Sequence, residues 1–155
     1  MMSEAPSIPR GTAIREAQAS DGDAWSRLRA ELWPSCTPER HRLEIAQVLR
    51  SAGVVAIATQ AGDPVGFAEV SVRVDHVEGT SSAPVPYLEG WYVAPAHRGR
   101  GIGTALLEFA ERWARQRGYH EMASDAEIDN ETSIRLHRLH GFAEVSKTVH
   151  FIKAL

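Results

Sequence analysis

Residues 98–104 read Arg98-Gly99-Arg100-Gly101-Ile102-Gly103-Thr104. A predicted strand over residues 87–93 precedes this stretch, and the most regular helical pattern of the chain follows it. Glycines let the backbone turn sharply and let its N–H groups approach a ligand without an intervening Cβ atom. The free N–H groups in the first turn of a helix, helped by the helix dipole, bind phosphate. The stretch therefore predicts a strand, a phosphate-binding loop and a helix, with Arg98 and Arg100 as further anion ligands.

The helix after the loop is predicted from apolar residues at i, i+3, i+4, i+7, i+8, i+11 and i+12, and Gly118 ends it. The apolar positions are Ile102, Ala105, Leu106, Phe109, Ala110, Trp113 and Ala114. Two other nucleotide-binding motifs do not fit. A P-loop would close with Gly-Lys-Ser/Thr, and a dinucleotide fingerprint would have a third glycine and lie early in the chain. A tight turn whose arginines are merely solvated remains an alternative.

The rest of the chain alternates between strand and helix patterns. Ser20 and Thr37 are the expected N-caps of two helices, of which the first ends at Pro34 and the second buries Leu43, Ala46 and Leu49. Strands are predicted over 12–17, 54–58, 65–74, 121–125 and, in one or two pieces, over 142–154, with a short helix over 130–140. We therefore expect a mixed α/β (α+β) fold, with one domain over residues 12–155 behind a loose leader, residues 1–11.

Composition excludes several classes of protein. The 155 residues carry a net charge of −3, and no basic stripe predicts a nucleic-acid partner. No apolar run reaches the about 20 residues of a membrane span. Cys36 is the only cysteine, so neither an internal disulfide nor a cysteine metal cluster is possible, and the histidines do not fall at ligand spacing. We expect a cytoplasmic protein without a metal, a membrane partner or a nucleic-acid partner.

Two blocks together resemble the GNAT acetyltransferases. Residues 98–104 resemble the family's Arg/Gln-x-x-Gly-x-Gly/Ala pyrophosphate loop. Asn130, His137, Gly141 and Phe142 resemble its Asn…Tyr-x-x-x-Gly-Phe segment, with histidine in place of tyrosine. The resemblance implies a central, mixed and mostly antiparallel sheet with a splayed parallel strand pair, flanked by about four helices. It also implies acetyl-CoA as co-substrate.

Shorter blocks resemble the bacterial aminoglycoside 6′-N-acetyltransferases, which give antibiotic resistance. They are Leu28-Arg29 with Leu32-Trp33-Pro34, Tyr87-Leu88-Glu89-Gly90, residues 121–125, and Asn130 with Ser133. The implied acceptor is a small polycation, and the implied reaction is direct attack of its amine on the thioester in a ternary complex. Another small amine, a polyamine or a peptide amine remains an alternative acceptor. A non-catalytic CoA-binding module is an alternative from a different class.

The resemblance also assigns roles to individual residues. Acetyl-CoA is held by residues 98–104, by the backbone of Trp91 and Val93, and by Asn130, which a helix N-cap explains equally well. The Trp91 amide is the oxyanion donor, unless it forms an ordinary ladder bond.

Glu89 and Asp125 either accept the amine proton or hold the ammonium, and His137 is the candidate acid for the departing thiolate, with packing as the alternative.

The acceptor is expected to meet acidic and aromatic side chains. The predicted substrate-binding residues are Trp33, Asp75, Glu78, Glu89 and Asp125, with a loop over residues 75–86 as one wall. Between residues 118 and 134 there are five acids (Glu121, Asp125, Glu127, Asp129 and Glu131) and no Lys or Arg, which is typical of a cation-binding surface or of a solvated loop. We expect a homodimer.

Overall fold

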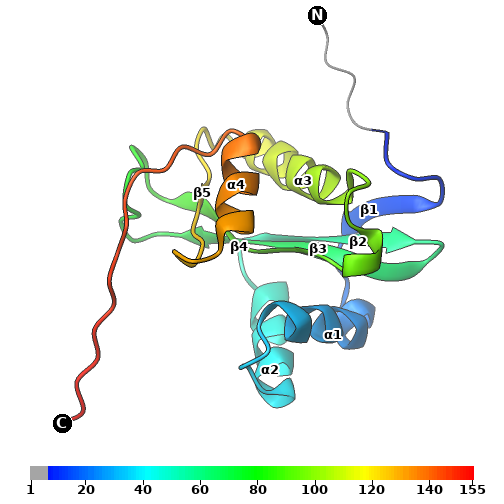
Figure 1. Cartoon of the computed structure of the whole chain (residues 1–155), viewed down its shortest axis with the longest axis horizontal. Coiled ribbons are helices and arrows are strands. Elements are labelled where there is room, and N and C mark those ends of the chain that lie inside the picture. Colours follow the sequence, from blue (N-terminus) through cyan, green and yellow to red (C-terminus); the bar gives the residue numbers. More distant parts are fainter. Residues whose placement is uncertain (1–6) are drawn as a thin grey trace, which may run out of the picture.

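The computed structural model describes residues 7–155 and contains a five-stranded sheet with helices on both faces (Figure 1). The strands lie in the order β1-β2-β3-β4-β5. The first three pairs are antiparallel, and β4 and β5 are parallel. The strands are β1 (Thr12–Glu16), β2 (Val54–Gln60), β3 (Asp63–Arg73), β4 (Val85–Val93) and β5 (Ala123–Ser124). The helices are α1 (Gly22–Leu32), α2 (Pro38–Leu49), α3 (Ile102–Gln116) and α4 (Glu131–Leu139). The predicted fold class is confirmed.

Each face of the sheet has its own core. Helices α1 and α2 cover one face, and α3 and α4 cover the other (Figure 1). On the first face, Trp25 and Ile45 pack against Ile57 and Phe67 of the sheet. On the second face, α3 packs Leu106, Leu107, Ala110 and Trp113 against the other side of the strands. Since both faces are covered, β2 is buried almost along its whole length, which explains its continuous apolar sequence.

Helix α2 confirms its predicted cap but not its predicted buried face. The Thr37 hydroxyl accepts a hydrogen bond from the Arg40 amide at 3.2 Å, as a capping threonine should. The prediction that Leu43 and Leu49 are buried is wrong, because they are 67% and 40% exposed. His41 and Ile45 lie inward instead. Helix α2 turns His41 toward the sheet because its ring accepts a hydrogen bond from the buried Arg29 side chain.

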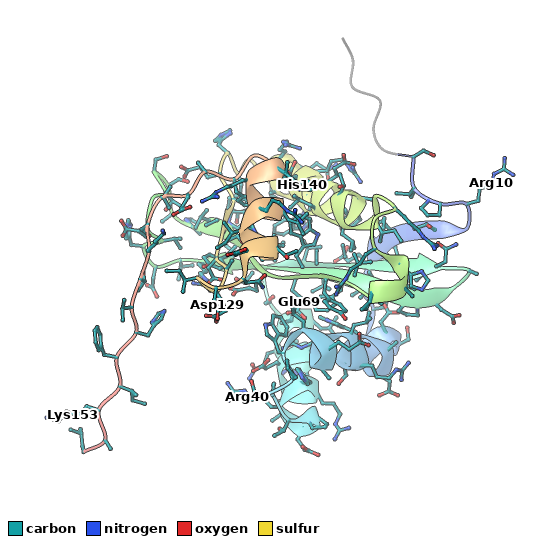
Figure 2. All side chains as sticks on the ribbon, in the orientation of Figure 1. Arg10, Arg40, Glu69, Asp129, His140 and Lys153 are labelled. Carbon is teal, nitrogen blue, oxygen red and sulfur yellow. The ribbon has the colours of Figure 1, made fainter. Side chains whose placement is uncertain are left out.

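A buried charge network fastens α1 and α2 to β3. Arg29 is 3% exposed and Glu69 is 4% exposed, and the guanidinium donates to both carboxylate oxygens. Trp25 Nε1 donates to the same carboxylate at 2.7 Å, and Arg29 Nε donates to His41 Nδ1 at 3.2 Å. Burial raises the pKa of the Glu69 carboxyl, and the Arg29 charge opposes that rise. Glu69 lies between the sheet and the helix pair (Figure 2).

The prediction of closing strands over residues 142–154 is wrong for this chain. Residues 142–155 contain no strand. Residues 143–155, here called the C-terminal arm, first pass beside the loop at Gly79 and then extend away from the body to Lys153 and beyond (Figures 1 and 2). Phe151 and Ile152 are 92% and 100% exposed. An extended segment becomes a strand only when a neighbouring backbone pairs with its N–H and C=O groups, and the arm meets no such neighbour.

The predicted leader falls partly outside the described residues, which begin at residue 7. In its described part, Arg10 and Gly11 are held by the β2–β3 turn: the Arg10 carbonyl accepts from Gln60 Nε2 at 2.8 Å, and the Gly11 carbonyl accepts from the Ala61 amide at 2.9 Å. Among the described residues no helix is both long enough and apolar enough to span a membrane.

Candidate active site

One extra residue in β4 opens the sheet. Along β3 and β4, Glu69 pairs with Gly90 and Val70 pairs with Leu88, so Glu89 has no partner of its own and forms a β-bulge. On its other side, β4 pairs with β5 only at Tyr87 and Leu88. The parallel strands therefore separate at the bulge, directly after Leu88, and the predicted strand over residues 121–125 is shortened to two residues.

The register determines which way the β4 amides point. Residue pairs of an antiparallel ladder alternate between those that exchange hydrogen bonds and those that do not. The Ala94 amide donates to the Val65 carbonyl at 2.8 Å, so the pair Gly66–Val93 and, two residues on, the pair Ala68–Trp91 do not exchange bonds. The N–H groups of Trp91 and Val93 therefore point away from β3, toward the side that β5 does not reach. Within residues 7–155 no group accepts a hydrogen bond from the Trp91 N–H, as the oxyanion hypothesis requires.

The glycine-rich loop follows directly. Gly99 and Gly101 have φ angles of +73° and +78°, a region that residues with a Cβ adopt at a cost of roughly 1–2 kcal/mol. Gly101 is the N-cap residue of α3, so the first amides of the helix are unpaired and point out of its end. Arg98 Nε donates to the Val93 carbonyl at 2.7 Å and ties the loop to the open edge of β4. The exposed Arg100 remains available to an anion. The loop is thus suited to a pyrophosphate.

Trp91 joins three elements of the site. Its indole Nε1 donates to the Gly103 carbonyl in the first turn of α3 at 2.8 Å. Its ring meets His137 of α4 and His140, the C-cap residue of α4, edge to face, with centroids 5.8 and 5.1 Å away. Thr104 Oγ1 lies 2.9 Å from His140 Nε2 and connects α3 to α4 directly. Trp91 therefore fixes the first turn of α3 and the C-terminal half of α4 relative to β4.

His137 is held by hydrogen bonds at both ring nitrogens. Nδ1 lies 2.7 Å from the Ser133 carbonyl oxygen, which can only accept, so Nδ1 carries a hydrogen. Nε2 lies 2.8 Å from the Ser124 hydroxyl, which is also 3.1 Å from the Leu88 carbonyl. A neutral imidazole accepts from Ser124. An imidazolium donates to it, and Ser124 then donates to Leu88.

The two predicted carboxylates, Glu89 and Asp125, differ in the number of hydrogen bonds that they accept. Glu89 accepts from Ser71 Oγ at 2.6 Å and from Arg73 at 3.0 and 2.8 Å. Among the described residues, Asp125 accepts a hydrogen bond from the Tyr87 hydroxyl alone, at 2.8 Å. Burial, followed by the bond to Asp125, raises the pKa of Tyr87 to about 12, so Tyr87 stays a hydrogen-bond donor at neutral pH. Asp125 therefore has more capacity left to accept a hydrogen bond from a ligand than Glu89 has.

A wide cleft of about 1430 Å³ lies beside these residues. It brings together four of the sequence-predicted residues, namely Asp75, Glu78, Asp125 and His137. Glu89 and Trp91 lie outside its lining, as does Trp33, which packs on the bulge: a Cβ at Gly90 would be 2.6 Å from Trp33 Cη2. Sequence reasoning missed Arg73, Tyr87 and Ser124. The sequence signal for Tyr87 and Ser124 was their place in the blocks that carry the subfamily resemblance, whereas nothing in the sequence indicated Arg73.

The loop that forms one wall of the cleft is anchored at a single carboxylate. Glu121 accepts five hydrogen bonds of 2.6–3.1 Å from four donors, the amides and hydroxyls of Ser81 and Ser82, and the Ser81 amide donates to both carboxylate oxygens. The bond from the Ser82 hydroxyl and those from Ser81 lower the pKa of Glu121 to about 2. Glu121 is therefore ionised at neutral pH and is used to hold the loop, not to bind a cation.

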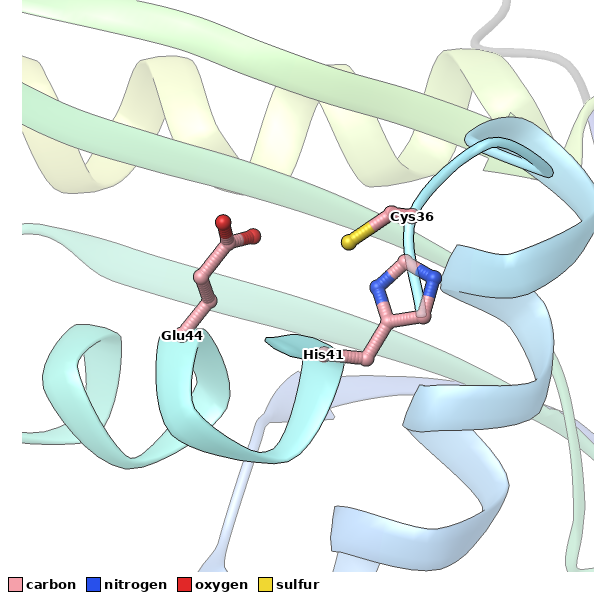
Figure 3. Close-up of side chains that lie close together, drawn as sticks. All are labelled: Cys36, His41 and Glu44. Carbon is pink, nitrogen blue, oxygen red and sulfur yellow. The ribbon is translucent and has the colours of Figure 1, made fainter. Parts of the chain in front are cut away.

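One group of side chains resembles a metal site. Ligand atoms of Cys36, His41 and Glu44 lie within 4.8 Å of one another (Figure 3). However, the Arg29 guanidinium already donates to His41 Nδ1 and to Glu44. A metal ion bound to these ligands would be repelled by the Arg29 guanidinium unless it displaced that group. We assign no metal to this group, and the absence of a metal stays a prediction.

Comparison with known proteins identifies this arrangement. Residues 18–142 match the model of the acetyltransferase (GNAT) family. The chain belongs to the GNAT family. The bulge, the free strand amides and the αL glycines of the loop are thus parts of a GNAT acetyltransferase.

Its relatives carry a common name. The chain is 42% identical to an aminoglycoside N(6′)-acetyltransferase type 1 of Stenotrophomonas maltophilia over 93% of this chain and 94% of the relative. It is 44% identical to the protein of the same name from Serratia marcescens over 86% and 92% of the two chains. Among solved structures, AAC(6′)-Iy in complex with CoA has a TM-score of 0.88 at 34% identity, covering 96% and 99%. AAC(6′)-Iy with the bisubstrate analog CoA-S-monomethyl-acetylneamine has a TM-score of 0.87 at 33% identity, covering 93% and 99%.

Gly101→Val tests the pyrophosphate loop of this GNAT acetyltransferase. A β-branched residue at φ +78° distorts the end of α3, so we expect the Kd for acetyl-CoA to rise about tenfold or more. Gly103→Ala is the matched control. The nearest atom to its new Cβ, Trp91 Nε1, would be 3.6 Å away, an ordinary contact, and affinity should change less than about threefold. Calorimetry measures both. Wild-type affinity in Gly101→Val would show that the loop does not hold the co-substrate.

Proposed function

We propose that this acetyltransferase transfers the acetyl group of acetyl-CoA to the 6′-amine of an aminoglycoside and thereby gives resistance to the antibiotic. The observation that carries the proposal is the free Trp91 N–H, which lies between a phosphate-binding helix end and a cleft with acidic residues. The names of the relatives supply the acceptor and the position of the amine. Acetyl-CoA supplies the activated acetyl group, and residues 98–104 and Asn130 would hold it.

The chain supplies three functions for direct attack by the amine. The Trp91 amide donates to the acetyl oxygen as negative charge develops there, which is worth a few kcal/mol (about 3–4) in comparable enzymes. A carboxylate takes a proton from the amine. His137 protonates the departing sulfur as an imidazolium, through Nε2 or through the Ser124 hydroxyl, because Nδ1 is committed to Ser133.

Asp125 is the better candidate for the base. In the part of the chain that the structure describes, its carboxylate accepts one hydrogen bond and lines the cleft, whereas Glu89 accepts three and does not line the cleft. We assign proton acceptance to Asp125 and electrostatic support of the acceptor to Glu89. This choice was open at the level of sequence.

The remaining amines of the acceptor need acids that the protein does not already use. Asp75, Asp125 and Glu127 line the cleft and form no salt bridge in residues 7–155. Glu78 has only an exposed contact of 3.9 Å with His76. Asp75, Glu78 and Glu127 can pair with the ammonium groups that are not acetylated, while Asp125 accepts the proton of the attacking amine. A polyamine would satisfy the same charges, so the regiochemistry decides between the acceptors.

The regiochemistry is tested with kanamycin-type substrates that bear either an amine or a hydroxyl at the 6′ carbon. The amine should be acetylated and the hydroxyl should not, because a hydroxyl is the poorer nucleophile. Mass spectrometry with NMR of the product identifies the modified nitrogen. Acetyl on another nitrogen, or turnover of polyamines alone, would contradict the proposed acceptor and leave the family unchanged.

Asp125→Asn should lower kcat about 10²–10⁴-fold, since the base is lost. Glu89→Gln keeps the shape and the Ser71 contact and should chiefly raise the acceptor KM. Calorimetry of CoA binding serves as control and should give wild-type values for both variants. The assignment is reversed if Glu89→Gln has the large loss in kcat and Asp125→Asn the change in KM.

We further propose that the protein is a homodimer, and that it is a cytoplasmic enzyme with one domain over residues 12–155. The C-terminal arm supports the dimer, because its Val145, Val149, Phe151 and Leu155 alternate in a strand pattern but are 61–115% exposed. β5 is the edge of the sheet, and a second copy's arm could pair there. Light scattering should give twice the chain mass, and Phe151→Asp with Ile152→Asp should give monomers. A monomeric wild type at micromolar concentration contradicts the dimer.

A further inference from the structure

Arg73 is a positive charge in a site that the proposed function requires to bind cations. It is the last residue of β3, and its guanidinium lies 3.4 Å from the centroid of the Tyr87 ring. The same group forms two hydrogen bonds to Glu89, from Nε at 3.0 Å and from Nη2 at 2.8 Å. The Arg73 guanidinium thus lies on an aromatic face and pairs with a carboxylate. Proteins bind organic ammonium ions with the same two kinds of group.

The position of Arg73 explains why the Glu89 carboxylate does not line the cleft. Arg73 and Tyr87 line the cleft, whereas Glu89, although it is bonded to Arg73, does not. The guanidinium therefore covers the carboxylate on the side from which an acceptor approaches.

We propose that Arg73 is an internal substitute for a substrate ammonium group: it occupies the Tyr87 face and the Glu89 carboxylate in the free enzyme, and the acceptor displaces it. This inference rests on the proposed function.

Displacement of this pair is energetically accessible. The Arg73 and Glu89 side chains are 42% and 33% exposed, so water can solvate the guanidinium once it moves. Partly exposed ion pairs contribute modestly to stability, more in the bidentate geometry seen here than in single contacts, and an incoming ammonium group replaces the pair. Glu89 also keeps its bond of 2.6 Å to the Ser71 hydroxyl, which holds the carboxylate in place when Arg73 leaves. Arg73 then acts on specificity, because an acceptor must offer a cation that competes with the guanidinium. Weakly basic amines and neutral sugars would leave Arg73 in position.

Arg73→Leu tests the competition. The acceptor no longer has to displace a cation, so its Kd for the CoA-bound enzyme should fall about three- to tenfold. Arg115→Leu is the matched control, because Arg115 lines the same cleft and pairs with Glu111 at 2.8 Å on the surface of α3. It removes the same charge from the cleft and should change Kd less than about twofold. Calorimetry with a kanamycin-type 6′-amine measures both, and thermal unfolding checks that both variants are folded.

Three results would overturn the proposal. An unchanged or higher Kd in Arg73→Leu would mean that Arg73 binds the acceptor or supports Glu89 instead of competing. An equal fall in Arg73→Leu and Arg115→Leu would mean that only the total charge of the cleft matters. A fall in kcat without a change in Kd would make Arg73 a positioning residue for Glu89. The product assay reports separately on the proposed function, since Arg73→Leu should still acetylate the same nitrogen wherever the wild type does.

Discussion

The bulge at Glu89 is the constraint on which the rest of the structure depends. One unpaired residue in β4, opposite Glu69, separates β4 from β5. Helix α1 holds the bulge in place from its face of the sheet. Glu69 forms a buried ion pair with Arg29 and accepts a hydrogen bond from the Trp25 indole. Loss of one partner from a buried ion pair costs about 3–5 kcal/mol, so the two layers cannot move apart at this point without a large penalty. The same position admits Trp33, because Gly90 has no side chain to exclude its ring.

The opened edge of β4 then organises the catalytic side of the sheet. The Val93 carbonyl holds Arg98 and hence the loop, while the Trp91 indole holds Gly103 and meets α4. The phosphate-binding end of α3, the free strand amide and His137 are consequently fixed relative to one another. Such fixed donors stabilise developing charge without reorganisation during the reaction. The acceptor side is built differently, from exposed acids and a loop tied down by Glu121, and it can adapt to its ligand.

Sequence reasoning succeeded where a local rule decides the outcome. The αL glycines of the loop, the Thr37 cap and the α3 stripe each follow from a few neighbouring residues. It failed where distant residues decide. Leu43 was predicted to be buried because it is apolar, but the bond between His41 and Arg29 turns the other face of α2 inward. Residues 142–154 have the composition of a strand, yet a strand also needs a neighbouring backbone to pair with, and residues 7–155 place none beside it. Arg73 could not be predicted to cover Glu89, because the two are 16 residues apart and meet only through the β3–β4 register.

The central claim is that the bulge leaves the Trp91 N–H free for the acetyl oxygen. Hydrogen exchange followed by NMR tests it residue by residue, with the Tyr92 amide as internal reference because its pair with Phe67 exchanges hydrogen bonds. In the free enzyme, the Trp91 amide should exchange much faster than that of Tyr92. A non-hydrolysable acetyl-CoA analogue should slow the exchange of Trp91 and leave Tyr92 unchanged. Equal protection of both amides in the free enzyme would mean that Trp91 is already paired, and the account of the site would be wrong.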